Sequence, residues 1–380
     1  MRFSSRGQVD PFIVMDVMEA ARAAEAAGRD IVHMEVGQPA TPAPKAARAA
    51  LAERLEGEAL GYTVALGLPE LRGGIAAHYK RCYDVDLDPA RVVVTAGSSG
   101  AFLLAFSALF DAGDKVALGE PGYPSYRQIL RAMSVEPVGI PTRPENRYQP
   151  VPSEIPEGVQ GLILASPGNP SGTMLGKPEL AALMAEAEAR DIAVISDEIY
   201  HGLHYEGRAV STLEVSDQAY VINSFSKYFS MTGWRIGWMV VPEAHIRTVE
   251  RLAQNMFICP PHASQVAALG ALDAIDELEA NRAVYAKNRQ LMLEGLPKAG
   301  FTKIAPPDGA FYVYADISDL TDDSLTFARD ILDQAGVAVT PGLDFEPHRG
   351  AQTLRFSYAQ STARIEEGLK RLQAFMAARG

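Results

Sequence analysis

The segment I-A-V-I-S-D-E-I-Y, residues 192–200, shows the pattern that decides the fold. It begins with a short apolar run in which polar and apolar positions do not alternate, and two acidic residues follow at once. A strand with such a continuous apolar run is typical of a parallel sheet that helices cover on both faces. Similar runs lie on either side of this segment: R-V-V-V-T at 91–95, K-V-A-L-G at 115–119, G-L-I-L-A-S at 161–166, Y-V-I-N-S at 220–224 and I-G-W-M-V-V at 236–241.

Helical patterns separate these runs, because residues 99–110 and 178–190 repeat apolar positions at the spacing of an α-helix. The alternation predicts an α/β fold. We predict a large domain over 30–280, with a mostly parallel sheet covered by helices on both faces, and a smaller α/β domain formed by 1–29 and 281–380.

The pattern changes after about residue 280, where shorter strands and a closing amphipathic helix are expected. The first thirty residues are predicted to be helical and to pack against the C-terminal domain or a partner subunit. The smaller domain should contain strands at 310–315, 337–340 and 353–358 and a helix near 325–335.

Composition excludes several classes of protein. Of the 380 residues, 47% are hydrophobic and 22% are charged, which is ordinary for a globular chain. The net charge of -12 disfavours nucleic acid as a partner. Cys82 and Cys259 have neither zinc-ligand nor disulfide-framework spacing, so we expect no metal and a cytoplasmic location. The N-terminus does not resemble a targeting signal, and no apolar run is long enough to span a bilayer.

The candidate chemistry lies where the predicted strands end. In open α/β sheets, ligands bind beyond the carboxyl ends of the strands. Each exit of the predicted large sheet carries polar or aromatic residues: A-G-S-S-G after 91–95, E-P-G-Y-P-S-Y after 115–119, P-G-N-P-S-G after 161–166, D-E-I-Y after 192–196 and F-S-K after 220–224.

The first exit carries only a weak signal. Small residues at 97–99 let backbone N–H groups and a helix dipole approach a phosphate, although a turn with a Ser cap has the same pattern. The spacing matches neither a dinucleotide-binding G-x-G-x-x-G nor a P-loop. A nicotinamide dehydrogenase is therefore disfavoured.

The segment N-S-F-S-K-Y-F-S-M-T-G-W-R-I-G-W, residues 223–238, carries a strong signal. It places two hydroxyls beside Lys227 and adds Arg235 eight residues later. Lysine is normally a solvated surface residue, but here apolar and aromatic residues flank it, as a desolvated amine nucleophile requires.

Together these segments resemble the fold type I pyridoxal-phosphate aminotransferases of class I/II, the aspartate-aminotransferase-like group, over essentially the full length. V-G-Q-P at 36–39, G-Y-T-V-A-L-G-L-P-E-L-R at 61–72 and L-R-F-S at 354–357 also match. The resemblance implies pyridoxal 5′-phosphate as cofactor, held as a Schiff base on Lys227. The phosphate ligands that it implies are Ser98, Ser99, Ser224, Ser226 and Arg235.

The resemblance also assigns roles to residues that have simpler explanations. It makes Asp197 the partner of the pyridinium nitrogen, where a helix N-cap is the alternative. Tyr200 would share the face of Asp197 if D-E-I-Y begins a helix. By resemblance, Tyr200 and Asn169 donate to the cofactor's phenolic oxygen, and Tyr123 stacks on its ring. A turn signal and a buried aromatic anchor are the alternatives for Asn169 and Tyr123.

Arg355 stands in an apolar strand, so it needs an anion. A structural ion pair is one possibility, and the resemblance implies a clamp on the substrate α-carboxylate, with the backbone of Gly37 nearby. Tyr62 resembles the tyrosine that reaches the phosphate of the neighbouring subunit. We therefore expect a homodimer with shared active sites.

The predicted function is transfer of an amino group from an L-amino acid to a 2-oxo acid by a ping-pong mechanism, with 2-oxoglutarate as the expected acceptor. Alternatives are another reaction on this scaffold, such as β-elimination, decarboxylation or an aminocyclopropane-type cyclisation, or a cofactor-binding regulator. The chain departs from the family pattern at Ser171, at P-G-L-D-F-E-P-H, 341–348, and at I-C-P-P, 258–261. No residue is identified as a clamp for a second carboxylate, so an acidic substrate is neither supported nor excluded.

Overall fold

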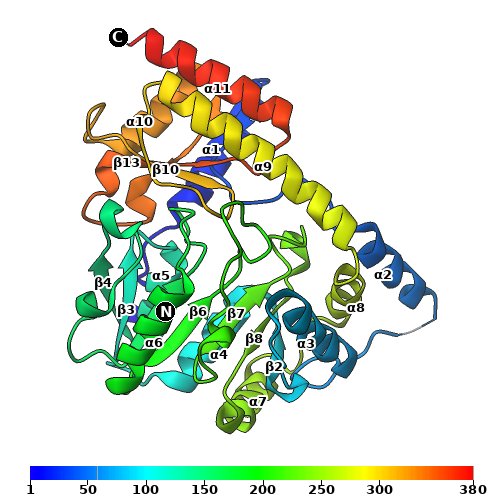
Figure 1. Ribbon diagram of the computed structural model, residues 1–380. Coiled ribbons are helices and arrows are strands. Elements are labelled where there is room, and N and C mark those ends of the chain that lie inside the picture. Colours follow the sequence, from blue (N-terminus) through cyan, green and yellow to red (C-terminus); the bar gives the residue numbers. More distant parts are fainter. Residues whose placement is uncertain (58, 380) are drawn as a thin grey trace.

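The computed structural model describes residues 1–57 and 59–379. Its centre is a seven-stranded sheet in the order β2, β8, β7, β6, β5, β3, β4 (Figure 1). Neighbouring strands are parallel from β7 to β4, whereas β8 is antiparallel to both β7 and β2. The strands are β2 Val92–Thr95, β3 Lys115–Glu120, β4 Glu136–Pro141, β5 Gly161–Ala165, β6 Ala193–Asp197, β7 Tyr220–Ser224 and β8 Gly237–Val240.

The predicted mostly parallel sheet is confirmed, and each of the six predicted runs matches one of these strands to within one residue at either end. The seventh strand, β4, was not predicted. Its sequence E-P-V-G-I-P contains two prolines and a glycine, which are unusual inside a sheet. Proline is tolerated here because β4 lies at the edge, where one side of the strand needs no N–H donors.

Helices cover both faces of the large sheet. Val93 packs on one face with helices α4, α5 and α7, whereas Val92 and Val94 pack on the other with α2, α3, α6 and α8. Alternate residues of a strand point to opposite faces, so both sets must be apolar. The helices are α2 Lys45–Gly57, α3 Pro69–Tyr83, α4 Gly97–Leu109, α5 Pro124–Ala132, α6 Lys177–Ala189, α7 Ile246–Met256 and α8 His262–Ala271.

A smaller antiparallel sheet, β12-β13-β10-β9, stands beside the large one together with α9, α10 and α11 (Figure 1). The predicted strand at 337–340 is divided, because β11 pairs with β1 whereas β12 joins the four-stranded sheet. The elements are β1 Val32–His33, α9 Ile275–Lys298, β9 Lys303–Ile304, β10 Tyr312–Asp316, α10 Ser324–Asp330, β11 Val337–Ala338, β12 Thr340–Pro341, β13 Thr353–Ser357 and α11 Thr362–Ala377.

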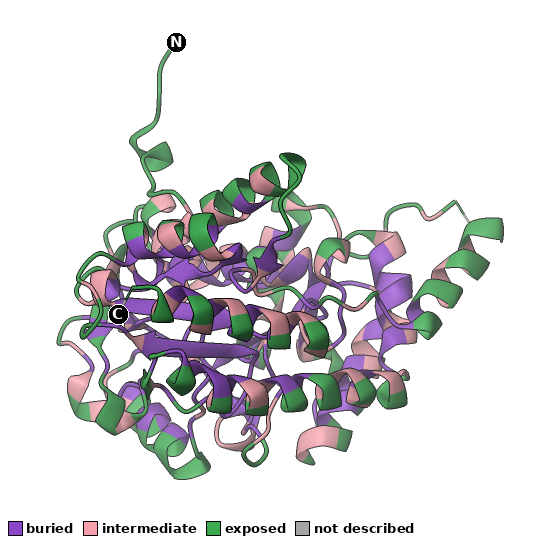
Figure 2. Ribbon diagram, turned by 90° about the horizontal axis from the view of Figure 1, so that it is seen from above, coloured by how far each residue is buried: buried purple, intermediate pink, exposed green. Residues whose placement is uncertain are grey.

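The N-terminal segment is helical only in part. Helix α1, Ile13–Ala26, packs near β11 and β12. The first ten residues are exposed: Asp10 bonds to Gln128 and Arg131 on α5, and the N-terminal end extends away from the body of the molecule (Figure 2). Among residues 1–57 and 59–379, no helix combines the length and apolar character needed to cross a bilayer. The same residues form no group of three or more His, Cys, Asp or Glu side chains placed to hold a metal ion.

Candidate active site

A cavity of about 240 Å³ opens at the C-terminal ends of the central strands. Ser98 follows β2, Asp197 ends β6 and Lys227 follows β7, and all three line it. These strands run in the same direction, so their ends meet at one edge of the sheet. The small sheet closes the cavity with Tyr312 and Arg355.

Lys227 reaches into the cavity from the turn after β7. Its Nζ donates to the carbonyl of Gly37 at 2.6 Å and lies 5.7 Å from the centre of the Tyr200 ring. Burial and the charge of Arg355 lower the pKa of Lys227 to about 8. The amine is therefore easier to deprotonate than a surface lysine, which a nucleophile or a proton carrier requires.

The Tyr312 side chain leaves no space for a side chain at Gly37. A Cβ there would lie 1.6 Å from the Tyr312 hydroxyl, so the close approach of this backbone to the cavity depends on glycine.

Asp197 is buried at the end of β6. The Tyr126 hydroxyl donates to Oδ2, and the Ile199 N–H donates to Oδ1 at 3.0 Å. Burial raises the pKa of Asp197 to about 6. The chain forms a turn here and no helix begins, so the alternative reading of Asp197 as a helix N-cap is wrong, as is a helical D-E-I-Y run.

Donors for an anion gather at the start of α4. Ser98 and Ser99 line the cavity in the first turn of this helix, where N–H groups have no partner within the helix, and Ser226 lines it as well. The guanidinium of Arg235 lies against Gly97, because a Cβ at Gly97 would be 2.4 Å from its Nη2. Gly97 has a positive φ of 71°, which also favours glycine. Hydroxyls, helix N–H groups and a guanidinium together suit a phosphate.

Arg355 lies in the middle of β13, buried between the rings of Tyr312 and Phe345, whose centres are 4.3 and 4.8 Å from its Cζ. Nη1 donates to Asn169 Oδ1 at 2.9 Å, and Nη2 donates to the Glu35 carbonyl. Nε has no partner among the described residues, which also offer this guanidinium no carboxylate at ion-pair distance. The structural ion pair considered from sequence is therefore absent from this part of the chain, and the charge is available to a ligand.

Two phenols complete the cavity wall near Lys227. The hydroxyls of Tyr200 and Tyr312 are 2.8 Å apart, and both side chains are buried. Tyr123 also lines the cavity, with its ring edge to face against Tyr126 at 5.2 Å. An anion corner, a buried carboxylate and an accessible amine are the features that pyridoxal phosphate requires, so the residues fit the cofactor that the resemblance implies.

The structure brings together most of the predicted site residues and leaves two apart. Ser224 does not line the cavity; its hydroxyl donates to the Ile236 carbonyl at 3.0 Å and lies 2.9 Å from Ser226 Oγ. Tyr62 is 84% exposed and lies outside the cavity of its own chain. The residues that line it as expected are Gly37, Ser98, Ser99, Tyr123, Asn169, Asp197, Tyr200, Ser226, Lys227, Arg235 and Arg355.

Several lining residues were not found from sequence. Tyr126 stands in the run P-G-Y-P-S-Y after β3, where an aromatic residue at a strand exit is a signal with several explanations. Nothing in the sequence marks the N-terminal residues Phe12, Val14 and Met15, because a helix that covers a cavity has the same apolar pattern as one that covers a core.

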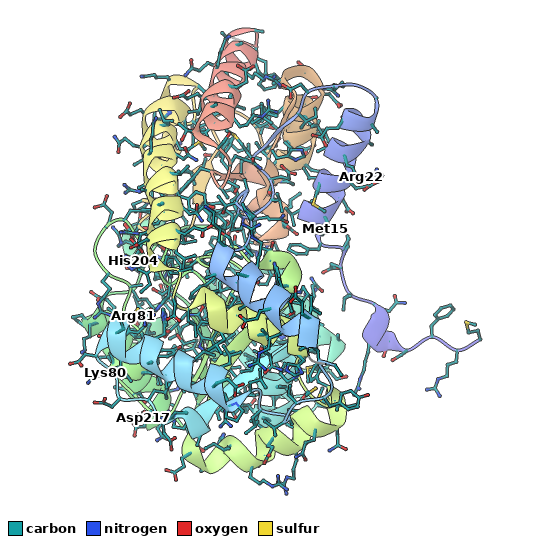
Figure 3. All side chains as sticks on the ribbon, turned by 90° about the vertical axis from the view of Figure 1, so that its right-hand side faces the viewer. Met15, Arg22, Lys80, Arg81, His204 and Asp217 are labelled. Carbon is teal, nitrogen blue, oxygen red and sulfur yellow. The ribbon has the colours of Figure 1, made fainter. Side chains whose placement is uncertain are left out.

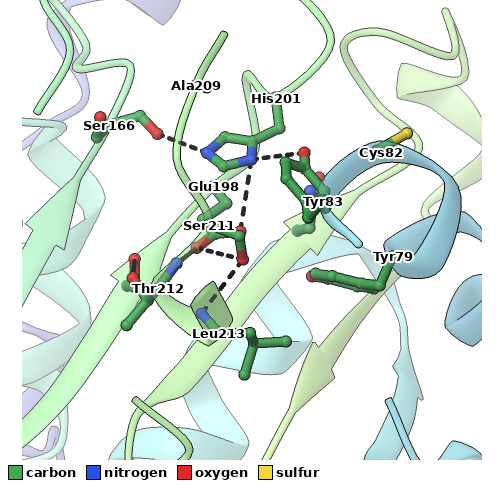
Figure 4. A network of polar contacts seen from close by, with 12 residues as sticks. Tyr79, Cys82, Tyr83, Ser166, Glu198, His201, Ala209, Ser211, Thr212 and Leu213 are labelled. Carbon is green, nitrogen blue, oxygen red and sulfur yellow. Dashed lines mark hydrogen bonds and ion pairs between the residues drawn. The ribbon is translucent and has the colours of Figure 1, made fainter. Parts of the chain in front are cut away.

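A buried polar network lies behind the cavity (Figure 4). Glu198 accepts hydrogen bonds from the Ser211 hydroxyl and the Thr212 N–H, at 2.9 and 2.7 Å. His201 Nε2 lies 3.0 Å from the Ser166 carbonyl and Nδ1 lies 2.7 Å from the Tyr83 hydroxyl. Burial raises the pKa of Glu198 to about 8 and lowers that of His201 to about 3. Both side chains are therefore largely neutral at pH 7, and they brace the turn between Asp197 and Tyr200.

Comparisons with known proteins agree with this geometry. A family model described as "Aminotransferase class I and II" matches residues 29–372. The chain is 48% identical over 382 aligned residues to a valine–pyruvate aminotransferase of Mycobacterium tuberculosis, covering 99% of this chain and 98% of that protein. A crystal structure of a putative aminotransferase from Silicibacter pomeroyi superposes with a TM-score of 0.95 at 67% identity over all of both chains. An aspartate aminotransferase from Thermus thermophilus with maleate gives 0.92 at 32% identity, over 99% of this chain and 100% of that one.

Proposed function

The chain belongs to the class I and II aminotransferases, and from this premise we propose that it moves the amino group of an apolar L-amino acid to a small 2-oxo acid, with pyridoxal 5′-phosphate bound at Lys227. Amino-group transfer itself follows from the family. The identity of the two substrates and the roles of the residues are the proposal.

The distribution of charge in the cavity carries this proposal. The described residues that line it include only three cationic side chains, Lys227, Arg235 and Arg355. In this proposal Lys227 binds the cofactor carbon covalently, Arg235 binds the cofactor phosphate, and Arg355 binds the substrate α-carboxylate. No cation is left on this wall for a second carboxylate, and the cavity also contains Phe12, Val14, Met15 and Val36. This wall favours a substrate with an apolar side chain.

The same argument bears on the acceptor. The sequence led us to expect 2-oxoglutarate, which has two carboxylates, whereas pyruvate has one and needs only Arg355. The relative from Mycobacterium tuberculosis is named for valine and pyruvate. We therefore favour pyruvate as the acceptor and valine or a similar residue as the donor.

In this proposal each side chain has a separate task. Ser98, Ser99, Ser226 and Arg235 hold the phosphate, and Ser224 supports Ser226 through their 2.9 Å contact. Bound at Lys227, pyridoxal phosphate supplies an electron sink that stabilises negative charge at the substrate α-carbon.

Other side chains fix the ring and the substrate. Asp197 accepts a hydrogen bond from the ring nitrogen and keeps it protonated. Tyr200 and Asn169 would donate to the ring oxygen, and Tyr123 would pack against the ring. Arg355, which lines the cavity, would hold the α-carboxylate with its guanidinium and so turn the α-hydrogen toward Lys227. Because its pKa is lowered from 10.5 to about 8, a much larger fraction of the Lys227 amine is neutral near pH 7 than in a surface lysine, and this neutral amine can accept that proton.

We also infer that two copies of the chain share their active sites. Tyr62 is 84% exposed, and Val64 and Ile258 beside it are 57% and 53% exposed. The Thr63 N–H donates to Cys259 Sγ at 3.4 Å, which holds these two loops together as one apolar surface. Pairing of this surface would let Tyr62 of one subunit reach the phosphate in the other. We retain the division into a large domain, 30–280, and a small one, 1–29 with 281–380, as part of this proposal.

A single-turnover experiment tests the proposed reaction. The protein, loaded with cofactor, is mixed with a panel of L-amino acids and no oxo acid, and the products are identified. One equivalent of 2-oxo acid per bound cofactor, fastest from valine-like donors, is the expected result. Catalytic release of ammonia or carbon dioxide would identify another reaction, and preference for aspartate or glutamate would contradict the apolar donor. Multiple turnover with pyruvate or 2-oxoglutarate then ranks the acceptors.

A further inference from the structure

The start of helix α1 forms one wall of the active-site cavity. Phe12, Val14 and Met15 line it, although they are more than 180 residues away in sequence from Lys227 and Arg355. Figure 3 shows Met15 in the first turn of α1, at the end of the helix nearest the large sheet. The Phe12 ring meets the Tyr123 ring edge to face at 5.9 Å. A substrate side chain that extends from the α-carbon toward this wall meets hydrocarbon.

Helix α1 has no capping side chain at its own N-cap position. Phe12 stands at the N-cap position, where a serine or aspartate is usual, and makes no side-chain cap bond. The first N–H groups of a helix have no partner within the helix. Here Asp344 takes that place: its Oδ1 accepts from the Ile13 N–H at 3.0 Å, and its Oδ2 accepts from the Val14 N–H at 3.2 Å.

Asp344 is itself held firmly. It is buried, and Arg127 donates to its backbone carbonyl at 3.1 Å and to that of Phe345 at 2.8 Å. Phe345 is the ring that lies against Arg355. Two adjacent residues therefore contact both parts of the proposed substrate site. Phe345 packs against the guanidinium of Arg355, which would bind the carboxylate, and Asp344 bonds to the start of α1, which would face the substrate side chain.

We propose that Asp344 is a positioning residue that holds the Phe12–Met15 segment against the cavity and so sets the preference for apolar substrate side chains. The inference rests on the proposed function, because it assumes that a substrate α-carboxylate binds at Arg355. Asp344 lies within residues 341–348, the segment whose sequence departs from the family pattern at Glu346. Asp344 acts through the N–H groups of α1 and touches no substrate atom.

The chain offers a matched control for this residue. Asp323 caps α10, where its Oδ1 accepts from the Thr326 N–H at 3.0 Å, and it does not line the cavity. Asp323→Asn and Asp344→Asn therefore make the same chemical change at two helix N-termini. Of these two residues, only Asp344 accepts a hydrogen bond from a residue that lines the cavity, Val14.

The first test compares kcat/KM for L-valine and L-alanine in the holoenzyme. Asp344→Asn leaves one acceptor oxygen and turns an amide NH2 toward an N–H group. A lost cap corresponds to roughly a fivefold effect, so we expect the valine to alanine ratio to fall about fivefold. Asp323→Asn is expected to leave the ratio unchanged. Equal ratios in wild type and Asp344→Asn, with the protein folded, would overturn the proposal.

A second variant and a binding measurement separate positioning from general damage. Phe12→Ala keeps Asp344 and removes part of the wall, and one extra or missing apolar contact is worth about tenfold in selectivity. Titration calorimetry of the cofactor-loaded protein with 3-methylbutanoate and propanoate reports the two halves of the site without turnover. Both variants should weaken 3-methylbutanoate more than propanoate. Equal weakening of the two anions would show that only the Arg355 side of the site was damaged.

The two proposals fail in different ways. If wild type prefers aspartate or glutamate, the apolar donor is wrong whatever Asp344 does. If wild type prefers valine, and Asp344→Asn and Phe12→Ala keep that preference, the proposed function stands and the role of Asp344 is wrong.

Discussion

Replacing Lys227 by methionine should stabilise the cofactor-free protein. Burial and nearby positive charge lower the pKa of Lys227 from 10.5 to about 8. Each pKa unit corresponds to about 1.4 kcal/mol, so below pH 8 the charged lysine costs the folded state about 3 kcal/mol. Loss of the hydrogen bond to the Gly37 carbonyl offsets about 1 kcal/mol of the gain. A net stabilisation of about 2 kcal/mol is expected near neutral pH.

The pH dependence gives this prediction its sign. Because the folded-state pKa is the lower one, the unfolded chain binds the extra proton between about pH 8 and 10.5, and wild-type stability rises with pH across that window. Above it the lysine is neutral in both states, and only the lost hydrogen bond remains. Lys227→Met should therefore be more stable than wild type at pH 7 and slightly less stable above about pH 10.5.

Urea denaturation followed by the fluorescence of the buried Trp238 measures the difference at both pH values. Lys287→Met, at an exposed position on α9, is the matched control and should show no such crossover. A Lys227→Met variant that is less stable than wild type at pH 7, or equally shifted at both pH values, would refute the reasoning.

Three further perturbations test the site and its surroundings. Asp197→Ala should slow the single turnover by two to four orders of magnitude, because losing one partner of a buried charge pair costs about 3–5 kcal/mol; an unchanged rate would remove Asp197 from its role. Arg355→Gln should raise KM for the amino acid about 10- to 100-fold in steady-state kinetics, since a hydrogen bond to a charged group contributes about 1.5–3 kcal/mol, and an unaltered KM would count against the clamp. The hydrogen bond to Glu35 raises the pKa of His33 to about 9, so His33 stabilises the fold fully below pH 6.5 and less as the pH rises through 9. His33→Gln should lower the denaturation midpoint most at the acid end of that range, and a constant gap would contradict this.

The large sheet could be predicted because its strands are buried on both faces. A run such as V-I-S-D at 194–197 then needs no partner information to be recognised, and the polar residue after it marks the edge where ligands bind. The edge strand β4 was not predicted, because its two prolines interrupt the apolar pattern of a strand. The chain forms a turn after Asp197 where a helix was expected. Asp197 Oδ1 accepts a hydrogen bond from the Ile199 N–H, and Glu198 and His201 are held by their own buried hydrogen bonds.

The site could be predicted only where the chemistry is local. Lys227 and Arg235 stand in one unusual motif, and Arg355 is conspicuous as a charge in an apolar strand. The partner of Asp197, Tyr126, comes from another exit, and a single aromatic residue there has too many explanations. The cap that Asp344 provides to α1 could not be seen at all, because the two residues that it joins are 331 positions apart.

That separation also governs how the molecule is made. Helix α1 is synthesised before its partners, because its N-terminal N–H groups bind Asp344, and the following strand β1 pairs with Val337. At synthesis rates of about 5–20 residues per second, the helix waits roughly 15 to 70 seconds for these partners. During that interval the part of its apolar face that packs against Leu332 and Ala338 is uncovered. A chain that ends just before Asp344 would therefore contain all seven strands of the large sheet and lack the side chain that caps α1.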